Sequence, residues 1–269
     1  MTFGRSARPE RWWLAGDPVA SALFDALSAT FPDGERFFVD SVRWYADRTP
    51  PALQAQIAAF VRQELVHSRE HVAFNRHMLQ HGRDLEGMQA DGRVQLDLAR
   101  QLPRPVQLAT TVCMEHFTAI LGRLALTEPR LFAGADPQAA RLWLWHALEE
   151  LEHKAVAFDT LSHATRRWPP PRRWLLRVVS MTYTTVGFLR TIRGNFRRIL
   201  ADDGVEPGTV RRATWRYLWI RPGLLRRLFL PWLAFFRPGF HPFDQDDRGL
   251  IAEAERKLGL AAGATPPPA

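Results

Sequence analysis

Apolar residues recur at intervals of three and four between residues 17 and 165, the periodicity of one face of an α-helix. Asp17 followed by Pro18 is typical of a helix start, and Pro50 and Pro51 interrupt the pattern. Residues 82–104 carry glycines and a proline, so we expect a long connection there, with room for a helical piece. Helices are expected at 17–30, 31–48, 51–81, about 105–126 and 137–165.

Two of these helices carry polar residues in the middle of an otherwise apolar stripe. An ionised side chain in apolar surroundings is costly unless it is paired or binds a metal. The pattern therefore predicts buried partners for both sets. The interrupting residues are Glu64, His67 and His71 in the first helix, and His146, Glu150 and His153 in the second.

The chain contains two Glu-x-x-His motifs, each following a lone glutamate on the preceding helix. Residues three apart share a helix face, so each motif offers one carboxylate and one imidazole to the same point. Four carboxylates and two imidazoles form the dinuclear site of ferritin-like bundles, and their charges balance two divalent ions. We therefore predict an all-α fold with a ferritin-like four-helix bundle at 17–165. The predicted ligands are the lone glutamates Glu35 and Glu115, the motif glutamates Glu64 and Glu150, and the motif histidines His67 and His153.

Some neighbouring residues compete with these ligands or extend the set. Glu35 falls in the first turn of the helix expected at 31–48, where the helix dipole alone would favour an acidic residue. Glu149 precedes His153 by four residues, a spacing that also suits ligation. Other side chains are positioned either to ligate or to orient a ligand through a hydrogen bond. The candidates for these additional roles are His71, His146, Glu149 and Asp159.

The single Cys113 excludes an internal disulfide and zinc sites built on several thiolates.

Charge divides the chain into two unlike parts. Residues 166–240 hold 16 arginines, no lysine and three acidic residues, a charge of +13, while the remainder carries −5. Arginines interleaved with Trp, Phe and Leu favour an anionic membrane or an acidic apolar substrate, or else packing against the acidic bundle; nucleic acid is less favoured. We expect three parts: a bundle at 17–165, a basic helical extension at 166–245, and a short helix with a Pro-rich tail at 246–269.

Four segments give the chain a family resemblance. FPDGERFF, QELVHSREHVAFN, WHALEELEHKAVAFD and RPGFHPFD, between about residues 30 and 245, resemble the bacterial proteins called predicted metal-dependent hydrolases. Phe243 stands in the last segment where a tryptophan would be expected. The resemblance implies a metal-requiring enzyme, with the six predicted ligands as its metal-binding residues. It implies no particular substrate.

The predicted site is compatible with more than one chemistry. Carboxylate and imidazole ligands suit two divalent ions, with iron favoured and manganese or zinc as alternatives. Iron would allow a di-iron oxidase or oxygenase to act on an apolar organic substrate, whereas redox-inert ions would activate water for hydrolysis. A non-catalytic metal-binding or membrane-associated protein is a third alternative. The N-terminus has no apolar secretory segment, so we expect a cytoplasmic protein, with peripheral contact to the inner membrane as the alternative. The catalytic residues and the oligomeric state stay open.

Overall fold

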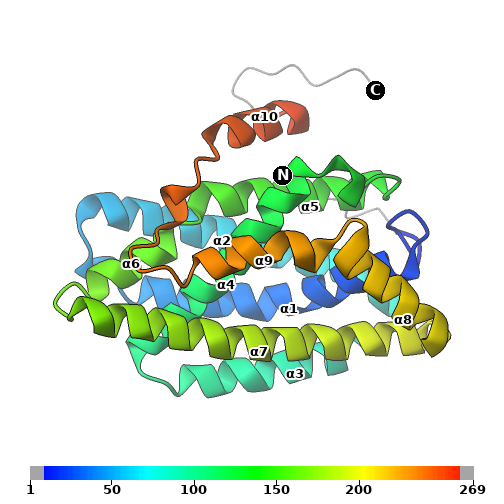
Figure 1. Ribbon diagram of the computed structural model, residues 1–269, viewed down its shortest axis with the longest axis horizontal. Coiled ribbons are helices and arrows are strands. Elements are labelled where there is room, and N and C mark those ends of the chain that lie inside the picture. The colour runs from blue at the N-terminus through cyan, green and yellow to red at the C-terminus, as the bar shows by residue number, and fades with distance from the viewer. Residues whose placement is uncertain (1–8, 261–269) are drawn as a thin grey trace.

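The computed structural model describes residues 9–260, and over this range the chain is helical without a β-strand (Figure 1). The predicted all-α class is confirmed, whereas the ferritin-like assignment and the three-part division stay predictions. The start of the chain and the end of the Pro-rich tail, AAGATPPPA, lie outside the described residues. The main helices are α1 (Pro18–Arg43), α2 (Pro51–Gln80), α3 (Leu85–Arg100), α4 (Arg104–Thr127), α5 (Pro137–His153), α6 (Val156–Ala164), α7 (Pro170–Asp202), α8 (Pro207–Trp215), α9 (Leu224–Ala234) and α10 (Arg248–Leu258).

Helix α1 is continuous, so the expected division into 17–30 and 31–48 was wrong. The pattern placed a boundary before Pro32, which cannot donate a hydrogen bond to the carbonyl of Ser28. That carbonyl instead accepts a hydrogen bond of 3.0 Å from Asn75 Nδ2 of α2. A side chain from the neighbouring helix thus replaces the missing backbone bond, and α1 passes through the proline without ending.

Two further boundaries differ from expectation. The helix expected at 137–165 is broken after His153 into α5 and α6. No proline or glycine marks the break; the buried ammonium of Lys154 lies there and is held by Asp247 Oδ2 at 2.6 Å and the carbonyl of Gln245 at 2.8 Å. The segment 82–104, expected to be mainly a connection, consists largely of α3.

Helices α1, α2, α4 and α5 surround a polar layer that lies between two apolar cores. Phe31 of α1 belongs to one core and Phe37 to the other, so the layer crosses α1 between them. Helices α4 and α5 approach closely at Gly122, where an added Cβ would lie 2.9 Å from the carbonyl oxygen of Ala147. A small residue is therefore required there, and it fixes the spacing of the two helices that carry half of the predicted ligands.

The arginine-rich segment covers the outside of these helices. Helix α7 runs the length of the molecule and packs on α1, α3 and α4, while α9 packs on α4 (Figure 1). Helix α9 lies antiparallel to α7, because Trp232 Nε1 bonds to Thr185 Oγ1 at 3.1 Å and Trp174 Nε1 bonds to the Phe236 carbonyl at 2.9 Å. None of the helices between residues 9 and 260 combines the length and apolar character needed to cross a membrane.

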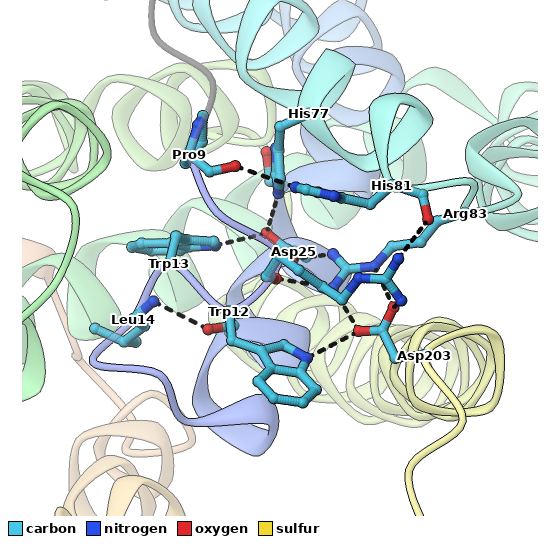
Figure 2. A network of polar contacts seen from close by, with 12 residues as sticks. Pro9, Trp12, Trp13, Leu14, Asp25, His77, His81, Arg83 and Asp203 are labelled. Carbon is cyan, nitrogen blue, oxygen red and sulfur yellow. Dashed lines mark hydrogen bonds and ion pairs between the residues drawn. The ribbon is translucent and has the colours of Figure 1, made fainter.

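A buried ion-pair network fastens the end of α7 to the rest of the molecule (Figure 2). The guanidinium of Arg83 lies 2.6 Å from Asp25 of α1 and 2.6 Å from Asp203, which follows α7. Trp13 Nε1 and Trp12 Nε1 donate further hydrogen bonds to Asp25 and Asp203, of 2.9 Å and 3.1 Å. Since the side chains of Arg83 and both aspartates are at most 1 % exposed, their charges depend on one another.

Candidate metal centre

The polar layer contains all six predicted ligands. Helix α1 supplies one lone glutamate and α4 the other, and α2 and α5 each supply a Glu-x-x-His pair. All six residues are at most 4 % exposed. Glu35 therefore lies in the interior of a continuous helix, so the helix-dipole explanation for this acidic residue was wrong.

Potential ligand atoms of the layer form four overlapping groups, and two of these consist only of predicted ligands. One atom each from Glu64, Glu115, Glu150 and His153 lies within 4.8 Å of the others, and the same holds for Glu35, Glu64 and His67. Glu64 belongs to both groups. Two such groups sharing a carboxylate are the arrangement expected of two neighbouring cation sites with a bridging ligand.

The carboxylates of the layer lack the donors that buried anions normally have. Among the described residues, neither oxygen of Glu35, Glu64 or Glu115 has a hydrogen-bond partner, and neither has Glu150 Oε2. His67 Nδ1 and His153 Nε2 are without one too, although His153 Nε2 lies 3.0 Å from Glu64 Oε1. Buried oxygen and nitrogen atoms that face each other without donors fit a bound cation. The donor set of the layer therefore fits divalent metal ions.

Both motif histidines are oriented by hydrogen bonds on their outer nitrogens. His67 Nε2 lies 3.0 Å from Glu149 Oε2, and His153 Nδ1 lies 3.1 Å from Gln63 Oε1. The other nitrogen of each ring faces the layer. Glu149 also accepts a hydrogen bond from Trp145 Nε1 at 2.8 Å, so both of its oxygens are engaged outside the layer. Of the two roles expected for Glu149, its contacts match the orienting one.

A hydrogen-bond chain extends from the layer through His146 and His71. Asn75 Nδ2 donates to the Ser28 carbonyl, so its Oδ1 accepts from the Ser28 hydroxyl. His71 Nδ1 then donates to Ser28 Oγ at 2.8 Å, and its Nε2 accepts from His146 Nδ1 at 2.8 Å. This leaves a lone pair on His146 Nε2, which lies 2.9 Å from Glu150 Oε1. Two acceptors at that distance need a proton or a metal ion between them, so the chain leaves His146 available as a third imidazole for the layer.

Sequence reasoning missed Ser28, Asn75 and Gln63 and misplaced Asp159. Asn75 lies four residues after His71 on the same face of α2, a spacing that could have identified it. Asp159 was expected to orient a ligand imidazole, but it lies 2.9 Å from His241 Nε2 and is part-exposed. Asp159 belongs to α6, which follows the break after His153.

The sequence comparisons agree with the chemistry of the layer. The profile of a family described as predicted metal-dependent hydrolase matches residues 1–246. The chain belongs to this family. No curated protein and no solved structure matches it significantly. The six predicted ligands lie within the matched range.

The ionisable groups of the layer shift one another's pKa in directions that favour a neutral layer in the metal-free protein. Burial raises the pKa of both lone glutamates well above the usual value, and the charge of Glu64 adds to this shift. Burial also opposes ionisation of the motif glutamates, but the motif histidines hold the pKa of both below the usual value. The carboxylates in turn overcome burial and raise the pKa of His67 and His153 well above the usual value. These shifts favour two imidazolium ions beside two carboxylates.

A groove of about 770 Å³ leads from the surface to the edge of the layer. It reaches the ring of His153 and is lined by Phe60, Trp145, Leu148 and the carboxylate of Glu152. Phe60 packs edge-on against His153 with ring centroids 5.0 Å apart. The groove is the approach by which a small molecule with an apolar part can reach the metal centre.

Proposed function

We propose that this protein is a dinuclear metal enzyme that uses O2 to oxidise a small, largely apolar organic molecule. The observation that carries the proposal is the ligand set, in which four helices bring four carboxylates and two Glu-x-x-His imidazoles to one buried point. Helical bundles with this set hold di-iron or di-manganese centres. Iron bound there would supply electrons to reduce O2 while the substrate is oxidised, with an external reductant restoring the ferrous state.

The residues of the chain have separate roles in this proposal. The lone and motif glutamates hold the ions, and Glu149 and Gln63 keep His67 and His153 in position. Aromatic rings exclude water: Trp145 lies 5.0 Å from His67, and Phe31 lies 5.0 Å from His146, between ring centroids. The apolar wall of the groove positions the substrate beside His153.

Hydrolysis is the second candidate, and the family description favours it. Metal ions in the layer would lower the pKa of a bound water. The groove supports hydrolysis as well, because water and a substrate with a polar, cleavable bond must both reach the layer. The lining of the groove includes the polar residues Gln56, Arg62 and Glu152.

A metal-exchange experiment distinguishes the two reactions. Full-length protein is prepared free of metal and loaded anaerobically with ferrous iron or with zinc. The oxidative proposal predicts O2 uptake and a change in near-ultraviolet absorption for the iron form, both lost in Glu150→Gln/His153→Gln. The double variant Glu86→Gln/His163→Gln, which alters residues outside the layer, should behave like the unmodified chain. If zinc protein cleaves esters or amides while iron protein consumes no O2, the enzyme is a hydrolase and the oxidative proposal is wrong.

A further inference from the structure

The outer face of α7 carries one continuous stripe that is apolar in its first half and basic in its second. Exposed side chains follow one another at intervals of three and four along this face. Tyr183 is 78 % exposed and Val186 is 65 % exposed, large fractions for side chains of this size in a folded helix. At 33 residues, α7 is roughly 50 Å long, and the stripe covers roughly 33 Å of it. The stripe consists of Leu175, Val179, Tyr183 and Val186, followed by Arg190, Arg193 and Arg197.

Helix α9 repeats the arrangement beside it. Arg226, Leu230 and Leu233 follow at the same intervals, and Arg237 continues the line beyond the helix. Leu230 is 70 % exposed. Because α9 lies antiparallel against α7, the molecule carries two neighbouring amphipathic helices with outward apolar side chains and arginines at their ends.

The arginines of this segment are not used for internal docking. If they served to hold the extension on the acidic bundle, ion pairs between the two would be numerous. Of the arginines of residues 166–240, only Arg198, with Asp91, and Arg227, with Glu128, form an ion pair with a described residue of the preceding helices and their loops. Several arginines of the segment have neither an ion pair nor a side-chain hydrogen bond to any described residue. They include Arg190, Arg193, Arg197, Arg211, Arg212, Arg216, Arg221 and Arg226.

The exposed apolar side chains and the unpaired arginines together indicate which kind of partner binds this face. The charge of +13 on residues 166–240 would make two copies of the face repel each other. Nucleic acid would use the arginines but would leave the exposed Leu, Val and Tyr side chains in water. An anionic bilayer uses both, since apolar side chains enter the headgroup region while arginines bind lipid phosphates. We propose that the outer face of α7 and α9 binds the surface of an anionic lipid membrane.

Sedimentation of the full-length protein with lipid vesicles tests the proposal. The vesicles are made of phosphatidylcholine alone or of phosphatidylcholine with phosphatidylglycerol, at low and high salt. We expect binding to the anionic vesicles only, weakened by salt because the attraction is screened. Arg190→Gln/Arg193→Gln/Arg197→Gln should bind roughly 100-fold more weakly, at about fivefold per arginine, and should lose much of its salt dependence.

A second variant tests the apolar contribution without changing the charge. Val186→Gln/Leu230→Gln should bind about tenfold more weakly per substitution and keep its salt dependence. The matched controls are Arg36→Gln/Arg43→Gln/Arg76→Gln and Val72→Gln/Leu79→Gln, which alter exposed residues of α1 and α2 and should bind like the unmodified chain. Helical content and metal load are compared across all forms.

Three results would overturn the proposal. The first is absence of binding to anionic vesicles at low salt. The second is unchanged vesicle binding by Val186→Gln/Leu230→Gln, because a surface that needs only its charge would suit any polyanion, including nucleic acid. The third is a concentration-dependent dimer of the unmodified chain that this variant abolishes, since the face would then join two copies.

Discussion

Loading the polar layer with two divalent ions at pH 6 is expected to release close to four protons per chain. The lone glutamates carry protons because burial raises the pKa of each well above its usual value. The motif histidines carry protons because the surrounding carboxylates outweigh burial and raise the pKa of each well above its usual value. Metal ligation requires all four groups in their deprotonated form. Two carboxylic acids and two imidazolium ions therefore lose one proton each.

The sign of the pH dependence follows from this count. The metal-free protein binds more protons than the metal-bound protein, so metal affinity rises with pH and is lost as pH falls. With about two protons displaced per ion, the mean affinity should rise roughly 100-fold per pH unit near pH 6. The dependence should flatten at high pH, where the histidines lose their protons before metal is added.

Titration calorimetry in two buffers with different ionisation enthalpies measures the number of protons released. The histidine variant His153→Gln should release fewer protons and bind less metal, while Glu86→Gln/His163→Gln should match the unmodified chain. Release of no more than one proton by the unmodified chain would refute the assigned protonation states and with them the neutral metal-free layer.

The other predictions concern three buried contacts of the helical fold. Replacing Arg83 with Met should lower the free energy of unfolding by about 3–5 kcal/mol, because the buried Asp25 and Asp203 lose their counter-charge; unchanged denaturant unfolding would show that the network in Figure 2 contributes little. Gly122→Ala should cost about 1–3 kcal/mol by pushing α4 from α5, again measured by denaturation. Asn75→Leu should weaken metal binding about 10- to 100-fold by releasing the orientation of His71 and His146; equal affinity by calorimetry would remove the chain from the site.

The meeting of the six predicted residues in one buried layer could be predicted because its signal is local. A Glu-x-x-His pair is defined by helical spacing alone, and two pairs with lone glutamates require only that four helices meet. The orienting partners were not predictable in this way, since Gln63 and Glu149 reach histidines on opposite helices and their pairing depends on the relative rotation of α2 and α5. The break after His153 could not be predicted either, because the buried ion pair at this point joins Lys154 to Asp247, which lies 93 residues further along the chain.

The bond between Asn75 and the Ser28 carbonyl has an evolutionary consequence. Because Pro32 has no backbone N–H, the Ser28 carbonyl lacks its helical donor and can accept a hydrogen bond from the Asn75 amide. The same amide sets the direction of the hydrogen-bond chain that leads to His146. A residue usually regarded as a helix breaker is therefore half of an interdependent pair. In related sequences positions 32 and 75 should covary: where the proline is replaced by a residue with a backbone N–H, the asparagine loses its acceptor and should be replaced as well.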